Sequence, residues 1–114
     1  MNNDGPSLAN QGEIFYVQGQ YEDALKTLNR SLEIDPNNSE ALISRGSTYS
    51  QMKRYEEALV DFNKALEIRP DNIKALINRG ATYTRLKRYD EAIKDTNRAR
   101  ELDPTYKLLR NGAK

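Results

Sequence analysis

Small and apolar residues recur along this chain with the spacing of amphipathic helices. In the middle of the chain, one such face is followed by a short basic break and then by a second face. The first face is Leu42, Gly46 and Tyr49, and the second is Ala58, Phe62, Ala65 and Leu66. Because spacings of i, i+4, i+7 and i+8 bring residues to one side of a helix, the pattern predicts two successive helices. Pro70 ends the second helix, since it lacks an N–H and disfavours helical geometry just before it.

The same pattern occurs three times along the chain, at one fixed interval. Gly12, Gly46 and Gly80 occupy equivalent positions, and aromatic, alanine and proline positions repeat with them. The repeating units are 5–38, 39–72 and 73–106. First helices are expected at about 6–18, 40–52 and 74–86, and second helices at about 21–34, 55–68 and 89–102. The remaining segments are 1–4, expected to be a flexible N-terminus, and 107–114, expected to be a short basic tail or partial capping helix.

The repeats predict an all-α fold built by stacking. A single helical hairpin cannot bury both of its faces, so neighbouring hairpins must complete its core. A glycine in the middle of a helix costs about 1 kcal/mol relative to alanine, which is acceptable where another helix must come close. The predicted fold class is therefore a solenoid of three helix-turn-helix repeats, with six helices.

Composition excludes several kinds of chemistry. The chain has no Cys and no His, which rules out disulfides, Ser-His-Asp catalysis and nearly all zinc sites. Carboxylate pairs such as Glu56-Glu57 recur at the starts of second helices, where they complement the helix dipole. We therefore expect no enzyme activity, no cofactor and no metal. No run approaches the ~20 apolar residues of a membrane span, and no signal peptide is visible, so a soluble cytoplasmic protein is expected.

Net charge is +1, but it is distributed unevenly. Residues 5–38 carry 2 basic and 5 acidic groups, a net of −3, whereas residues 73–106 carry 8 and 5, a net of +3. One interpretation is a solvated charged surface. The alternatives are an acidic partner at the basic end, or a self-associating assembly unit whose acidic end meets the basic end of another copy. Nucleic-acid binding is not expected, since 17 acidic residues oppose the phosphate affinity of the basic end.

The repeated pattern resembles that of the tetratricopeptide repeat family. The resemblance rests on Leu42, Gly46, Tyr49, Ala58, Phe62, Ala65 and Pro70, and on their equivalents over residues 5–106. It implies a right-handed superhelix whose first helices line a concave groove. It also implies a non-catalytic module that binds a peptide or a partner protein in that groove.

Within this resemblance, the register assigns candidate peptide-binding residues to the groove side of the first helices. They are Glu13, Tyr16, Ile43, Ser44, Ser47, Lys74, Ile77, Asn78 and Arg85, with Ala9, Asn10, Val17, Glu40, Gln51 and Ala81 on the same faces. Asn78 can donate to and accept from a peptide backbone. Lys74 and Arg85 can attract carboxylates.

One subtype of the family binds the C-terminal carboxylate of chaperone tails with a clamp of Lys and Asn, then Asn, then Lys and Arg. The equivalent positions here are Ala9 and Glu13, then Ser44, then Lys74 and Asn78. Only Lys74 fits the clamp, and Glu13 would repel a carboxylate. Chaperone tails are therefore not the expected partners.

Two further sets of residues on the first helices admit specific interpretations. Ile43 and Ile77 form an apolar line with Ala9, either as an exposed strip for ligand side chains or as local packing between adjacent helices. Arg45 and Arg79 stand where the family often has an aliphatic residue. An arginine there is expected to lay its stem on the core and keep its head in water.

The third unit departs from the second on its second helix, where Thr96 and Arg100 replace Phe62 and Leu66. A terminal repeat needs a polar outer face, because no further repeat covers it. We interpret Thr96 and Arg100 as a built-in cap at the end of the array. The competing interpretation is a polar binding face at that end.

Overall fold

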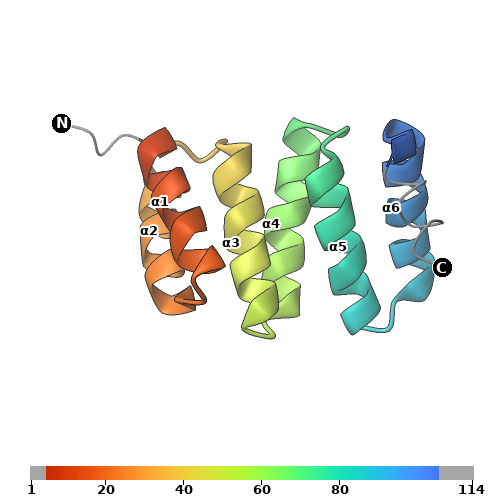
Figure 1. Ribbon diagram of the computed structural model, residues 1–114, viewed down its shortest axis with the longest axis horizontal. Coiled ribbons are helices and arrows are strands. Elements are labelled where there is room, and N and C mark those ends of the chain that lie inside the picture. The colour runs from red at the N-terminus through yellow and green to blue at the C-terminus, as the bar shows by residue number, and fades with distance from the viewer. Residues whose placement is uncertain (1–4, 106–114) are drawn as a thin grey trace.

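The computed structural model describes residues 5–105, which form six α-helices joined by short turns (Figure 1). The helices are α1 (Gly5–Val17), α2 (Tyr21–Ile34), α3 (Ser39–Gln51), α4 (Tyr55–Ile68), α5 (Ile73–Arg85) and α6 (Tyr89–Leu102). No strand occurs among these residues, and the predicted all-α class is confirmed. Helices α2, α4 and α6 have the predicted bounds, while α1, α3 and α5 begin and end one residue earlier than predicted. The segments 1–4 and 107–114, for which a flexible N-terminus and a basic tail are predicted, lie outside the described residues.

Side-chain caps and turn geometry set where the helices begin. The Oδ1 atoms of Asn38 and Asn72 accept hydrogen bonds from backbone N–H groups three residues later, at 3.1 and 3.0 Å. Each cap satisfies an amide group that the start of a helix leaves unpaired. Inside the hairpins, the turn residues Gly19, Lys53 and Lys87 have φ values of 80°, 64° and 63°. This left-handed backbone favours glycine, so the closure of the hairpin imposes it on the two lysines.

The three hairpins stand side by side in a row, with α1, α3 and α5 along one side (Figure 1). Helix α3 contacts both helices of the first hairpin, and α5 contacts both helices of the second. The molecule measures 46 × 25 × 25 Å along its principal axes. Each hairpin covers an apolar face of its neighbour, which makes the fold a helical repeat solenoid. None of the six helices is both long and apolar enough to cross a membrane.

A core of small and branched side chains runs through the stack. Phe62 of α4 and Leu28 of α2 are fully buried, and each faces a glycine on the first helix of its own hairpin. The equivalent residue of the third hairpin is Thr96, which is only partly buried. Its hydroxyl donates to the carbonyl of Ala92 at 2.9 Å, so it is satisfied within its own helix. The core therefore becomes smaller and more polar towards the last helix.

Two buried ion pairs hold the second and third hairpins, and they correct one expectation. Arg45 donates through Nε and Nη2 to both carboxylate oxygens of Asp61, each at 2.8 Å, and through Nη1 to Asn29 at 3.0 Å. Asp61 is 2% exposed. The head of Arg45 thus lies on a buried carboxylate and not in water, because an unpaired Asp at this position would be strongly destabilising. The hydrogen bond to Asp61 raises the pKa of Arg45 above its ordinary value, against the opposing effect of burial.

The third hairpin repeats this arrangement at the equivalent positions. Arg79 donates to both carboxylate oxygens of Asp95 at 2.7 Å and to Asn63 at 2.9 Å. In each case the asparagine belongs to the second helix of the preceding hairpin. The arginine therefore ties the two helices of its own hairpin together and connects that hairpin to the one before it.

Candidate functional site

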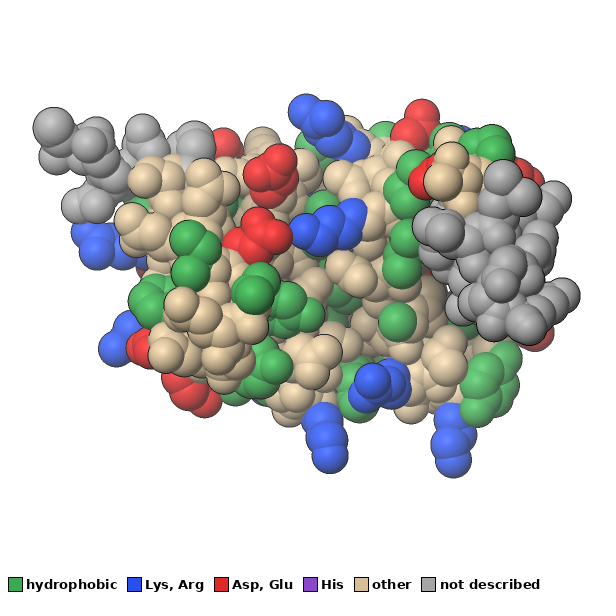
Figure 2. Space-filling view, in the orientation of Figure 1, with side chains coloured by type: hydrophobic (Ala, Val, Ile, Leu, Met, Phe, Trp, Pro, Cys, Tyr) green, Lys and Arg blue, Asp and Glu red, His purple; other side chains and the backbone are tan. Residues whose placement is uncertain are grey.

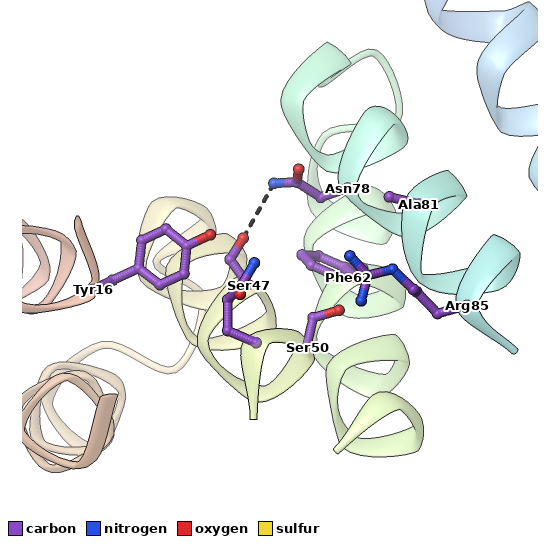
Figure 3. A pocket seen from close by; sticks show the side chains of 8 residues that line it. Tyr16, Ser47, Ser50, Phe62, Asn78, Ala81 and Arg85 are labelled. Carbon is purple, nitrogen blue, oxygen red and sulfur yellow. Dashed lines mark hydrogen bonds between the residues drawn. The ribbon is translucent and has the colours of Figure 1, made fainter. Parts of the chain in front are cut away.

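The side of the row formed by α1, α3 and α5 contains an open pocket of about 80 Å³, which we call the central pocket (Figure 3). Its lining residues are Tyr16, Ser47, Ser50, Gln51, Phe62, Asn78, Ala81 and Arg85. Tyr16 comes from α1 on one side, and Asn78 and Arg85 come from α5 on the other (Figure 3). The ring of Phe62 from α4 lies at the bottom. Three hairpins therefore contribute to one site.

Polar contacts between α3 and α5 shape the wall of the central pocket. Asn78 Nδ2 donates to Ser47 Oγ at 3.1 Å (Figure 3). Ser50 Oγ and Thr82 Oγ1 lie 3.1 Å apart, and Thr82 also donates to the backbone carbonyl of Asn78 at 2.9 Å. These bonds keep hydroxyl and amide groups at the pocket in defined positions. Such groups can donate to and accept from the backbone of a bound chain.

Charged side chains lie at two places along the same side. Lys74 of α5 and Glu13 of α1 form an ion pair with Nζ and Oε2 3.3 Å apart. This pair spans the side of the row above α3 and links the first hairpin to the third. At the opposite end of α5, Arg85 is exposed and its Nη1 lies 3.4 Å from the hydroxyl oxygen of Tyr55. Because exposed ion pairs contribute only about 0–1 kcal/mol, the Lys74–Glu13 pair can be broken at low cost.

The structure divides the predicted site residues into three groups. Tyr16, Ser47, Asn78 and Arg85 line the central pocket. Glu13 and Lys74 lie outside it and bind each other. The third group points into the core. Ile43 is 3% exposed and Ser44 is 7% exposed, and Ile77 is partly buried and packs against the core.

The apolar line of Ala9, Ile43 and Ile77 is therefore not an exposed strip. Ala9 is 4% exposed and belongs to the same buried cluster as Ile43. The alternative interpretation, local packing between adjacent first helices, describes these residues. Helices α1 and α3 contact each other, and this contact covers the side chains that the register places between them.

Two lining residues were missed by the sequence interpretation. Ser50 was not assigned to the groove, and Phe62 was assigned only to the core. The spacing of Ser50, three residues after Ser47 on the same helix, was the available signal. The acidic partners Asp61 and Asp95 were also missed, although both follow their arginines by 16 residues in the sequence.

Within residues 5–105, no group of acidic side chains is arranged to hold a metal ion. The exposed pairs Arg54–Glu57 and Arg88–Glu91 lie at the starts of α4 and α6, with contacts of 2.8 and 2.6 Å. Hydrogen bonds from these arginines lower the pKa of Glu57 and of Glu91 below the ordinary value. These carboxylates are therefore paired with arginines at equivalent positions of the second and third repeats.

Comparisons with known proteins give a consistent result. The family model described as Tetratricopeptide repeat matches residues 39–72 and 73–106, and a second model, described as TPR repeat, matches residues 12–53. A search of curated protein sequences returned no match.

Several solved structures are similar to the chain over most of its length. The first TPR of Spaghetti (RPAP3) bound to HSP90 peptide SRMEEVD has a TM-score of 0.85 and 30% identity, covering 91% of this chain and 82% of that one. The second TPR of the same protein, bound to the same peptide, has a TM-score of 0.83 and 28% identity, covering 88% and 93%. The first TPR domain of human RPAP3 has a TM-score of 0.83 and 31% identity, covering 88% and 79%.

Proposed function

The chain belongs to the tetratricopeptide repeat family, and we propose that it is a non-catalytic protein-interaction module whose central pocket binds an extended peptide. The observation that carries the proposal is the lining of this pocket. Hydroxyl and amide side chains from α3 and α5 converge there with the aromatic ring of Tyr16. An extended peptide offers unpaired N–H and C=O groups at every residue, which such side chains can match.

Arg85 gives the pocket a preference for negative charge. Its contact with the Tyr55 hydroxyl is long for a hydrogen bond, at 3.4 Å. Among residues 5–105, no ion pair includes Arg85. A ligand carboxylate can therefore bind this guanidinium without displacing a carboxylate of the protein. The proposed ligand is an extended peptide with an acidic residue placed at Arg85.

Chaperone tails must be reconsidered as ligands. Two of the similar structures hold the HSP90 peptide SRMEEVD, so the expectation that such tails are not partners has no support from the comparisons. What still opposes them is the ion pair between Glu13 and Lys74. We propose that Glu13 lowers the affinity for a terminal carboxylate, because it occupies Lys74 and repels a second anion.

Peptide binding can be tested with a library of fluorescent extended peptides, read by polarisation. We expect acidic peptides to bind, and Arg85→Ala to weaken them by about tenfold, since a hydrogen bond to a charged group is worth about 1.5–3 kcal/mol. Arg30→Ala is the matched control, because Arg30 is an exposed arginine on α2 outside the pocket. Equal binding by the wild type and by Arg85→Ala would contradict the assignment of the site.

The role of Glu13 is tested with SRMEEVD itself. Glu13→Asn should raise the affinity for this peptide by up to about fivefold, because an exposed ion pair contributes about 0–1 kcal/mol. Titration calorimetry of the wild type and of Glu13→Asn measures the change in affinity directly. An unchanged or lower affinity would show that Glu13 does not oppose the binding of a terminal carboxylate at Lys74.

A further inference from the structure

Two contacts join the second hairpin to the third, and the first of them also joins the first hairpin to the second. Each arginine of the buried ion pairs also donates to an asparagine of the preceding hairpin, as Arg79 does to Asn63 at 2.9 Å. In addition, Leu59 of α4 is 5% exposed and belongs to one apolar cluster with Tyr83 of α5. Together they define what a hairpin face needs from its neighbour: a polar donor for the asparagine and an apolar cover beside it.

The last helix presents the same positions without a following hairpin among the described residues. Asn97, exposed, is the equivalent of Asn63, and its Oδ1 accepts a hydrogen bond from Nη1 of Arg100 at 3.2 Å on its own helix. Ile93 is the equivalent of Leu59 but is 56% exposed. Tyr89 beside it is 55% exposed. We call Tyr89, Ile93 and Asn97 the α6 end face. A hollow of about 230 Å³ lies on it.

The first helix presents the other half of the same interface. Ile14 is 55% exposed, although its equivalent Thr48 is fully buried between the first and second hairpins. Val17 is 74% exposed, and Gln11 stands where the later repeats have the interface arginine. We call Gln11, Ile14 and Val17 the α1 end face. Beside it lies a hollow of about 430 Å³, and Figure 2 shows hydrophobic side chains gathered over α1.

We infer that the α6 end face of one copy docks on the α1 end face of a second copy, so that the repeat stack continues head to tail between chains. In the register of the internal interfaces, Ile93 meets Phe15 of the second copy, as Leu59 meets Tyr83. Within the chain, Arg85 lies against Tyr55. Between copies the equivalent residues are Val17 and Tyr89, so two exposed apolar residues pair there. The amide of Gln11 stands in the place of the arginine and donates to Asn97 Oδ1, which also accepts from Arg100.

Charge favours the same arrangement. The first repeat, 5–38, has a net charge of −3 and the third, 73–106, a net charge of +3. A head-to-tail contact brings these two together, whereas a symmetric contact would bring like charges together. The internal interfaces hold Phe62 and Leu66 where the α6 end has Thr96 and Arg100. The contact between copies is therefore weaker than the internal one and reversible.

Two blocked variants test the arrangement. Val17→Lys places a charge on the α1 end face, and Ile93→Lys places one on the α6 end face. By sedimentation at rising concentration, the wild type should exceed its monomer mass of 13.1 kDa, and each variant alone should form no chains. An equimolar mixture should form a particle of two chains and nothing larger. The only intact faces that remain are the α6 end face of Val17→Lys and the α1 end face of Ile93→Lys, and these two can pair once. The two lysines repel each other, so the blocked faces cannot pair.

Val60→Lys is the matched control. Val60 is 67% exposed on α4, and its equivalents in the other repeats are Lys26 and Lys94. This variant should associate like the wild type. A wild type that keeps the monomer mass at every concentration would overturn the inference. The inference would also be overturned if the mixture of Val17→Lys and Ile93→Lys associated no more than either variant alone. The result is independent of peptide binding, which uses the central pocket and not the end faces.

Discussion

The second and third hairpins, residues 39–72 and 73–105, follow the same sequence frame but join their two helices differently. In the second hairpin, Gly46 faces the fully buried ring of Phe62, and a Cβ added there would lie 2.7 Å from Cε1 of that ring. In the third hairpin, Gly80 faces the smaller Thr96, whose Oγ1 would lie 3.5 Å from an added Cβ, and the nearest atom, Cβ of Asp95, would lie 3.4 Å away. The size of the residue on the second helix therefore decides whether the glycine is required.

The same two hairpins agree closely in their buried ion pairs. Arg45–Asp61 and Arg79–Asp95 have contacts of 2.8 and 2.7 Å, with the carboxylate side chains 3% and 6% exposed. The polar link is thus retained in the last hairpin while the large apolar contact is lost. The third hairpin therefore has a smaller residue opposite its glycine but keeps a paired carboxylate in its own interior.

The largest expected effect comes from breaking this shared link. Asp61→Ala should lower the free energy of unfolding by about 3–5 kcal/mol, because it leaves the guanidinium of Arg45 partly buried without its carboxylate. Asp95→Ala should have a similar effect, confined to the third hairpin. Urea denaturation followed by circular dichroism measures the loss of stability in Asp61→Ala. Hydrogen exchange shows which hairpin is destabilised in Asp95→Ala.

A double variant keeps this test decisive if Asp61→Ala does not fold. Replacing both Arg45 and Asp61 with leucine should restore most of the lost stability, since an apolar pair can substitute for a buried ion pair. The family often has an aliphatic residue at the arginine position. If the double variant were as unstable as Asp61→Ala, the loss of stability would not come from an unpaired buried charge.

The next largest effect is expected when Phe62 of the second hairpin is replaced by threonine, the residue at the equivalent position of the third hairpin. Phe62→Thr should destabilise the protein by about 3 kcal/mol, at the low end of the range for removing a buried aromatic ring. The reverse change, Thr96→Phe, should alter stability by less than about 1 kcal/mol, because the ring would remain partly exposed. Thermal unfolding of the two variants compares them. Equal losses would mean that the outer face of α6 is packed as tightly as the interior.

The sequence could predict the helices because their signals are local and repeated three times. Apolar spacing and a proline after each second helix place the ends of α2, α4 and α6 correctly. The site was less predictable. The register identifies which side of a helix faces the groove, but the closeness of neighbouring first helices decides exposure, as the burial of Ile43 shows. Likewise, no local signal marked Asp61 as a buried partner, since its arginine lies 16 residues away on the other helix.

The smallest and sharpest test exchanges the two glycines for alanine. Gly46→Ala should destabilise by about 1–3 kcal/mol, because the buried ring of Phe62 cannot move away from the added methyl group. Gly80→Ala should be neutral or stabilise by up to about 1 kcal/mol, because alanine has the higher helix propensity and the added methyl group makes only ordinary van der Waals contacts, at 3.4 Å and beyond. The helix propensity term is the same in both hairpins. Any difference in melting temperature therefore reports the packing alone, and two equal shifts would contradict the view that Phe62, rather than the repeat pattern, requires Gly46.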